Sequence, residues 1–270
     1  MQQPAWHGID LDAETALALL EWQAELGADE PGLDAPLDRF ELASRPAAEP
    51  VAPPVSAPTL ALGDGDDLPA RLAQAEALAA AAPTLDALAA AQECFDGLDL
   101  KKGARNFCFA DGNPAARVLI LGEAPGDEED RQGRPFVGRS GQLLDRMFDA
   151  IGLSRQAPDA ERALYITNVL TWRPPGNRDP QPDEIALSLP FVRRHIDLAA
   201  PDLIVLMGNI ACDAGLGRRG ILRLRGTWTQ AFGRPALPMT HPAYLLRNPP
   251  AKREAWADLL SLAARLDGRA

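Results

Sequence analysis

Several short motifs in this 270-residue chain combine residue types that could recognise a flat, polar ring. The turn GEAPG (122–126) begins and ends with Gly122 and Gly126, which let backbone N–H groups approach a ligand closely. Phe136, in RQGRPFVGRSG, could stack on a planar ring. Asn168, at the end of YITN, could offer both an acceptor and a donor to the edge of a base.

Two proline-rich stretches add further candidates. RPPGNRDP (173–180) is stiff and basic, and it suits a surface loop that positions Asn177. THPAYLLRNP (240–249) carries a histidine, an apolar tip and Arg247. An apolar wedge beside a cation could hold open a disrupted base stack while it contacts phosphate. The tip consists of Tyr244, Leu245 and Leu246.

Each motif also has a purely structural interpretation. GEAPGDEED could be an ordinary turn between a strand and a helix, whose four acidic residues complement the helix N-terminus. Phe136 and the leucines of the tip could belong to the core, and Asn168 could bond to its own backbone. The residue types leave both interpretations open. The glycine spacing is neither GxGxxG nor that of a phosphate-binding loop ending in GKS or GKT, which disfavours a dinucleotide or P-loop site.

The elements that must position these motifs are short apolar runs alternating with helical stretches. The runs are Val118–Leu121, Leu164–Ile166, Leu203–Met207 and Ala236–Met239, and the helical stretches include 139–152, 182–199 and 251–266. This alternation predicts an α/β fold, a three-layer αβα sandwich with a central, mainly four-stranded parallel sheet. Such sheets bind ligands at the carboxyl ends of their strands, where these motifs follow the runs.

The first part of the chain has a different composition. Residues 11–28 have the spacing of one amphipathic helix, and 44–70 is rich in Pro and Ala with no period, which is typical of a flexible linker. Thr84 is a predicted N-cap after a helix break at Pro83. The predicted organisation is an acidic helical segment (1–43), a linker (44–70), short helices (71–93) and the main domain (94–270).

The net charge of −11 is unevenly distributed along the chain. Residues 1–90 hold three basic and sixteen acidic side chains, whereas the rest holds 24 basic and 22 acidic ones. A DNA-binding surface in the second region is therefore not excluded. The acidic segment could bind a basic partner or cover such a surface, although simple solvation is the commoner explanation for acidic segments.

The cysteines and the apolar runs bear on the compartment. Cys94, Cys108 and Cys212 are widely spaced and odd in number, which favours reduced thiols over a disulfide framework. No apolar run approaches the roughly 20 residues that span a bilayer, and no secretory signal is visible. We expect a cytoplasmic protein that does not associate with membranes.

Three longer stretches resemble, in order, the motifs of family 4 uracil-DNA glycosylases, a branch of the uracil-DNA glycosylase superfamily. The stretches are GEAPGDEEDRQGRPFVGRSGQLLDRM, YITNVLTWRPPGNRDP and THPAYLLRNP, and the resemblance covers about residues 94–265. It implies a DNA repair enzyme that flips uracil out of DNA and hydrolyses its N-glycosidic bond. The products would be free uracil and an abasic site.

The resemblance also implies roles for individual residues. His241 would donate a hydrogen bond to uracil as negative charge develops on the leaving base. Glu123, Glu129 and Asn177 would position water and assist catalysis. The residues expected to bind uracil are Gly122, Ala124, Phe136 and Asn168. Those expected to contact DNA are Arg134, Tyr244, Leu245, Leu246 and Arg247.

One departure from the family concerns its usual cofactor. Family members usually carry four cysteines that hold a [4Fe–4S] cluster. The matching positions here are Phe95, Leu98, Trp172 and Ser188. We therefore expect no cofactor, with apolar packing in its place. Covalent capture of DNA is not expected either, because 133–140 is compact and lacks the histidine of the covalently trapping branch.

The expected partner is uracil-containing DNA, single- or double-stranded, bound by a monomer. Two alternatives remain at this stage. The chain could be a non-catalytic module that recognises uracil or abasic sites, or a glycosylase with a shifted preference for other deaminated bases.

Overall fold

The computed structural model describes residues 5–6, 9–10 and 68–268, which belong to two units, Met1–Asp64 and Gly65–Ala270. In the first unit, β1 (Ala5–Trp6) and β2 (Ile9–Asp10) form an antiparallel pair. The helix predicted over 11–28 and most of the predicted linker lie outside the described residues.

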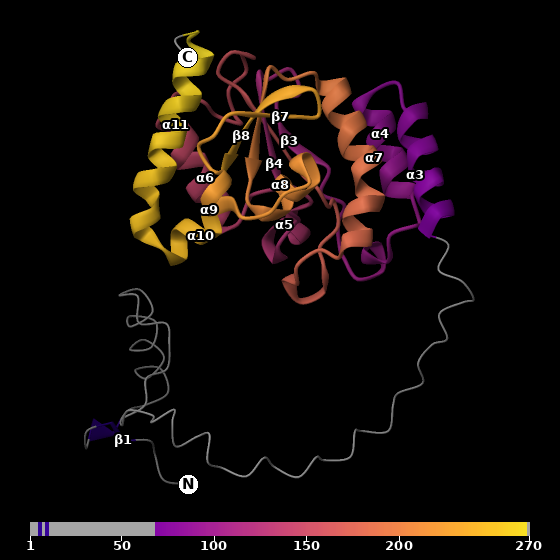
Figure 1. Cartoon of the computed structure of the whole chain (residues 1–270). Helices are drawn as coiled ribbons and strands as arrows, with labels where there is room; N and C mark the ends of the chain where they lie inside the picture. Colours follow the sequence, from indigo (N-terminus) through magenta and orange to yellow (C-terminus); the bar gives the residue numbers. More distant parts are fainter. Residues whose placement is uncertain (1–4, 7–8, 11–67, 269–270) are drawn as a thin grey trace. The chain divides into compact units, whose positions relative to one another are not determined.

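The second unit is built on a six-stranded sheet with the order β3-β5-β4-β6-β8-β7 (Figure 1). Its four inner strands are parallel, and each edge strand is antiparallel to its neighbour. The predicted parallel sheet of four strands is thus confirmed. The strands are β3 (Ala110–Gly112), β4 (Val118–Gly122), β5 (Leu164–Asn168), β6 (Leu203–Met207), β7 (Thr229–Ala231) and β8 (Arg234–Met239).

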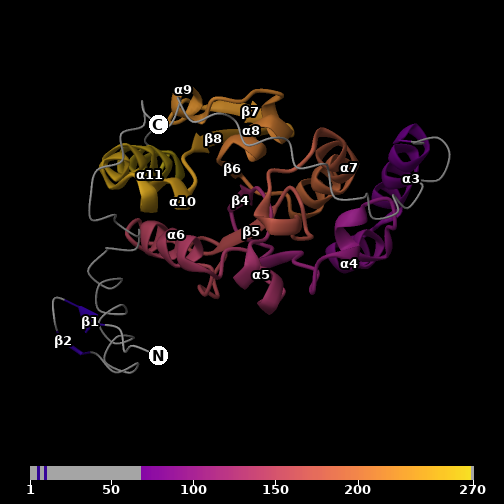
Figure 2. The same cartoon turned by 90° about the horizontal axis from the view of Figure 1, so that it is seen from below.

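Helices cover both faces of this sheet, as Figure 2 shows. One face packs on α6 (Arg139–Asp149) and α11 (Lys252–Leu266). The other packs on α7 (Pro182–Ala199) and α8 (Asn209–Leu216). The predicted three-layer architecture is therefore confirmed.

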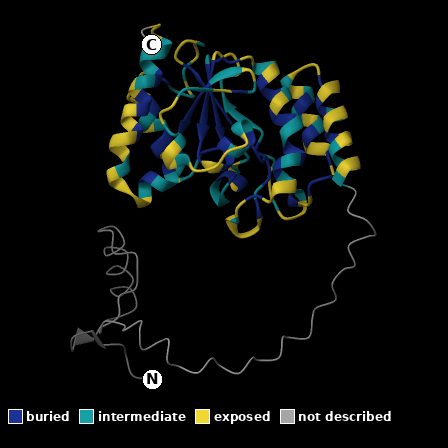
Figure 3. Cartoon of the chain, in the orientation of Figure 1, coloured by how far each residue is buried: buried dark blue, intermediate teal, exposed yellow. Residues whose placement is uncertain are grey.

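The central strand β4 shows why apolar runs, not alternating patterns, predict the inner strands. Val118 and Ile120 pack on the side of α6 and α11, whereas Leu119 and Leu121 pack on the side of α7 and α8. All four side chains are fully buried, because successive residues of a strand point to opposite faces and both faces are covered. The inner strands β4, β5 and β6 are accordingly buried along their whole length (Figure 3).

A helical hairpin, α3 (Leu68–Ala81) and α4 (Leu85–Cys94), packs against the outer side of α7. The side-chain oxygen of Thr84 accepts a hydrogen bond from the Ala87 N–H at 3.2 Å, which confirms the predicted N-cap. Helix α3 begins at Leu68, although the linker was predicted to extend to residue 70. It begins earlier because Leu68 already packs into the apolar cluster that α4 and α7 share.

The two edge strands were not predicted. β3 has only three residues, and β7 is joined to β8 by the two-residue turn Phe232–Gly233. Both turn residues have positive φ, 52° and 73°, as the common two-residue hairpin turns require. The dipeptide Phe-Gly is a weaker turn signal than Asn-Gly, and for this reason the hairpin is hard to recognise in the sequence.

Short elements connect the strands at the carboxyl edge of the parallel sheet. They include α5 (Asp127–Gln132), η2 (Pro175–Asn177), α9 (Ile221–Leu224) and α10 (Pro242–Arg247). Two further short elements are η1 (Asp99–Lys102), which precedes β3, and η3 (Pro249–Ala251), which joins α10 to α11. β4, β5, β6 and β8 all end at this edge, so the motifs that follow them in sequence meet in space.

The three cysteines are free thiols. Cys94 is exposed, whereas Cys108 and Cys212 are buried, and burial raises the pKa of each of the two to about 12. Within the described residues, none of the helices combines the length and apolar character needed to cross a membrane.

His195, on α7, is a buried histidine in the main core. Its Nε2 lies 2.8 Å from the Tyr165 hydroxyl, and its ring stacks on Phe109 with centroids 4.4 Å apart. Burial lowers the pKa of His195 from 6.5 to about 3, so the folded protein holds this ring neutral.

This burial predicts acid sensitivity. Between pH 6.5 and about pH 3, His195 is protonated in the unfolded chain but stays neutral in the folded protein. As the pH falls from 6.5 to about 3, the free energy of unfolding should therefore decrease, by up to about 1.4 kcal/mol per pH unit from this group. Urea denaturation at a series of pH values should show a shallower dependence for His195→Gln. Equal slopes for the two proteins would contradict the assignment.

Candidate active site

A cavity of about 580 Å³ opens at the carboxyl edge of the parallel strands. The turn after β4, the loop after β5, the start of α8 and the start of α10 all contribute to its walls. Predicted site residues that line it are Glu123, Ala124, Glu129, Phe136, Asn177, His241, Tyr244 and Arg247. Residues that line it and were not predicted include Ser140, Arg178, Asn209, Arg219, Ile221 and Thr240.

His241 is the N-cap of α10, and its geometry fixes the position of its proton. The Nδ1 atom accepts a hydrogen bond from the Ala243 N–H at 3.2 Å, so the neutral ring carries its proton on Nε2. Burial, and to a smaller extent the positive charge of Arg247, lower the pKa of His241 from 6.5 to about 4. The ring is thus a neutral hydrogen-bond donor at neutral pH.

Phe136 and Asn168 meet directly above Gly122. A Cβ atom at Gly122 would lie 2.3 Å from Asn168 Oδ1 and 2.4 Å from the Phe136 ring, so only glycine fits there. Gly122 and Asn168 are register partners in the β4–β5 pair, which brings the two motifs together. The Phe136 ring also stacks on His241, with centroids 5.3 Å apart.

Asn168 is 2% exposed, and its Oδ1 has no hydrogen-bond partner among the described residues. A buried polar atom without a partner is costly, which favours a ligand that supplies the missing donor. Neither Gly122 nor Asn168 lines the cavity itself, and the Phe136 ring, which does line it, lies directly over Gly122.

Glu129 is committed to the backbone. Its carboxylate accepts hydrogen bonds from the N–H groups of Gly126, Val137 and Gly138, at 3.1, 2.9 and 2.9 Å. These bonds join the GEAPG turn to the segment that carries Phe136. This carboxylate therefore holds two walls of the cavity together.

Glu123 contrasts with Glu129. Its carboxylate faces the cavity and forms no hydrogen bond or ion pair within the described part of the chain. Burial raises its pKa above the usual value of 4.5, nearby Asp179 adds to this, and Arg219 opposes it. Of the two glutamates, Glu123 is the one whose oxygens are available to water or substrate.

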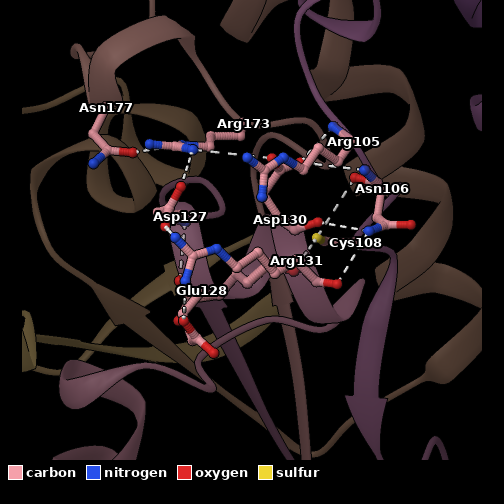
Figure 4. Close-up of polar contacts among 11 residues, drawn as sticks. Arg105, Asn106, Cys108, Asp127, Glu128, Asp130, Arg131, Arg173 and Asn177 are labelled. Carbon is pink, nitrogen blue, oxygen red and sulfur yellow. Dashed lines mark hydrogen bonds and ion pairs between the residues drawn. The ribbon is translucent and has the colours of Figure 1, made fainter.

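Asn177 is positioned by an arginine that was not predicted (Figure 4). Its backbone has a positive φ of 54°, and its Oδ1 accepts a hydrogen bond from Arg173 Nε at 2.8 Å. The same guanidinium bonds Asp127 at 2.5 Å and lies 4.0 Å from Asp130. Arg173 thus ties the turn of η2 to the first turn of α5. Arg173 opens the basic stretch RPPGNRDP, four residues before the predicted Asn177, and this was the signal in the sequence that could have identified it.

The opposite side of α5 is held by a second set of contacts in Figure 4. Asp130 is 2% exposed and accepts hydrogen bonds from the backbone N–H groups of Arg105 and Asn106, at 2.8 and 3.2 Å. The Cys108 thiol donates to the Glu129 carbonyl at 3.2 Å. Both sides of α5 are therefore fixed, and Glu129 with them.

Comparison with known proteins identifies the family. The model of the uracil DNA glycosylase superfamily matches residues 109–260, more than half of the chain. The chain belongs to the uracil DNA glycosylase superfamily.

Individual relatives agree with this assignment. The type-4 uracil-DNA glycosylase of Thermotoga maritima is 39% identical over 146 residues, which cover 53% of this chain and 73% of the relative. That of Saccharolobus solfataricus is 37% identical over 165 residues, covering 57% and 73%. That of Archaeoglobus fulgidus is 36% identical over 169 residues, covering 59% and 82%.

The segment that was expected to contact DNA is helical in this structure. Residues Pro242–Arg247 form the helix α10, whereas the sequence suggested a loop with an apolar tip. Leu245 is fully buried in a cluster with Leu143 and Ala255, because helical periodicity turns it toward α6 and α11. Its side chain is therefore not exposed in this structure, and contact of Leu245 with DNA stays a prediction.

The other four expected DNA contacts differ in accessibility. Tyr244 and Leu246 are half-buried, and Arg247 is exposed at the cavity rim. The Arg134 side chain is 55% exposed and lies outside the cavity, near Asp111. Only the first turn and the last residue of α10 thus face the cavity.

The residues at the family's iron–sulfur positions do not fit a cluster. Phe95 and Leu98 are buried with Phe191 from α7, and Trp172 packs with Leu100 and Leu170. Ser188 is fully buried, and its hydroxyl has no hydrogen-bond partner among the described residues. None of these side chains offers a thiolate, the usual ligand of such clusters.

The geometry of His241 can be tested by NMR titration. The imidazole should remain neutral, with its proton on Nε2, down to about pH 4. Arg247→Gln should raise this pKa, because it removes a positive charge that opposes protonation. Arg134→Gln is the matched control and should leave the titration unchanged. A wild-type pKa near 6.5 would exclude a buried neutral ring.

Proposed function

We propose that this chain excises uracil from DNA by hydrolysing the N-glycosidic bond, which releases uracil and leaves an abasic site. The observation that carries the proposal is His241, a neutral Nε2–H donor beside the Phe136 ring in a cavity at the carboxyl edge of the sheet. The names of the relatives, type-4 uracil-DNA glycosylases, support the same activity.

During the reaction, opposite charges develop on the base and on the sugar, and the site must stabilise both. The base must leave its stack to enter the cavity, and bond cleavage then puts negative charge on uracil and positive charge on the sugar. We assign the hydrogen-bond donor to His241 Nε2–H, because this N–H can donate to the uracil oxygen on which negative charge develops.

The other roles follow from which groups are free. Glu123 has a carboxylate available to face the sugar cation or to orient a water molecule. Asn168 would read the polar edge of uracil, since its Oδ1 lacks a donor. Glu129 and Asn177 would act by holding the walls of the cavity, because their side-chain oxygens are already bonded.

DNA would approach over α10 and the rim of the cavity. Arg247 is exposed, lines the cavity and forms no ion pair within the described residues, so it is available to a phosphate. Tyr244 and Leu246 flank it. Arg178 and Arg219 are paired with Glu184 and Asp213, and a phosphate would have to compete with these carboxylates.

The remaining parts of the proposal concern the form in which the protein acts. We propose a cytoplasmic monomer that takes uracil from single- or double-stranded DNA, since residues of one chain build the whole cavity. We also propose that activity needs no iron–sulfur cluster, because apolar side chains fill the positions of its ligands.

Uracil release from an oligonucleotide with a single uracil tests the activity. The wild type should release uracil, and His241→Ala should be slower by about 10²–10³-fold, the usual cost of removing one such donor. His195→Gln is the matched control, since it removes a buried imidazole outside the cavity. Binding without release would favour a recognition module, and preferential release of another deaminated base would indicate a shifted substrate.

Independence from iron is measured separately. Protein produced without added iron and treated with a chelator should keep both its unfolding temperature and its rate of uracil release. A family member with four cluster cysteines, treated in the same way, is the control. Iron bound in a fixed ratio to this chain, or activity that returns only with iron, would contradict the proposal.

A further inference from the structure

Arg155 is a buried arginine outside the cavity, in the loop that follows α6. Its side chain is only 8% exposed, yet it carries a charge that burial disfavours. We infer that Arg155 is a positioning residue that fixes the Phe136 ring in the orientation needed to bind the flipped base. This inference rests on the proposed function, because it assigns Phe136 to the uracil pocket.

The backbone at Phe136 needs such support. Its φ is +53°, in the left-handed region that bulky residues rarely adopt. A strained backbone of this kind persists only when its surroundings determine it. The ring is attached to this backbone and lies against His241 and the space above Gly122, so a shift of the backbone would move the ring.

Arg155 holds the two carbonyl groups at this point. Its Nη1 donates to the Pro135 carbonyl at 3.0 Å and its Nη2 to the Phe136 carbonyl at 2.9 Å. The Phe136 carbonyl is also enclosed on its other side, where a Cβ at Gly141 would lie 1.8 Å from the oxygen. This carbonyl is therefore confined between a guanidinium and the start of α6.

Two carboxylates orient the guanidinium in turn. Asp111 on β3 accepts from Nη1 at 2.9 Å, and Asp145 on α6 accepts from Nε at 2.8 Å. A lysine could not replace these contacts, because the ammonium lacks the planar set of five N–H donors. The arginine thereby links the sheet edge and α6 to the loop of Phe136.

Glu129 completes the clamp from the opposite side. The N–H groups of Val137 and Gly138 donate to its carboxylate, while the preceding two carbonyls accept from Arg155. Of these four consecutive residues, the first two are thus held at their carbonyls by the cation Arg155. The last two are held at their N–H groups by the anion Glu129. A shift of the Phe136 backbone would have to break one of these sets.

The inference predicts a specific kinetic effect. In Arg155→Lys, the KM for uracil-containing DNA should rise about threefold to tenfold, the value of a lost aromatic stack, while kcat changes less. Inhibition by free uracil should weaken to the same extent. Arg117→Met is the matched control, since Arg117 also binds two carboxylates, Glu161 and Asp202, but outside the cavity.

A double-mutant cycle separates positioning from general stability. If Arg155 acts through the ring, Arg155→Lys should have little further effect on KM once Phe136→Leu has removed the ring. Effects that simply multiply would overturn the inference, as would an unchanged KM and uracil inhibition in a folded Arg155→Lys protein.

The same cycle can be run without catalysis. An oligonucleotide with 2′-fluorinated deoxyuridine resists cleavage, because fluorine destabilises the sugar cation, and its binding reports on the pocket alone. Coupling between Arg155 and Phe136 in this binding would support the inference, whereas a wild type that releases no uracil from unmodified uracil-containing DNA would refute the proposed function. Release of uracil from unmodified DNA, without coupling in the binding of the fluorinated oligonucleotide, would support the proposed function and refute the inference.

Discussion

The absence of a side chain at Gly122 is the constraint on which the rest of the site depends. β4 and β5 end side by side, and Gly122 is the register partner of Asn168. Because no Cβ occupies the space above Gly122, the Phe136 ring and the Asn168 amide can both lie there, and the His241 ring stacks beside them. An aromatic surface, an amide and a neutral imidazole thus meet within one small volume.

The charged groups around this volume divide into two kinds. Glu129, Asp130 and Arg173 form hydrogen bonds with backbone groups and neighbouring side chains, and they keep the walls of the cavity in place. Glu123 and Arg247 have no such partners within the described residues and face the cavity. The site therefore keeps few groups free for a ligand and commits the others to its own geometry.

The sequence predicts the sheet well because continuous apolar runs such as Val118–Leu121 leave little choice in a domain covered on both faces. It predicts the candidate site less completely. The motifs located Phe136 and His241, but the contacts of Arg155 and Arg173 join segments that lie far apart in the chain. Leu245 shows a different difficulty. A short apolar run between prolines fits a loop and a helix equally well, so the sequence does not show that this side chain is buried.

The buried thiols have a consequence for the chemistry of the interior. Oxidants and metal ions react with the thiolate form of cysteine, and a pKa near 12 keeps Cys108 and Cys212 protonated at any ordinary pH. Cys108 lies against Glu129, so modification of its sulfur would disturb the carboxylate that holds the loop of Phe136. Burial and the raised pKa of this thiol thus disfavour oxidation at the point where Cys108 contacts the Glu129 backbone.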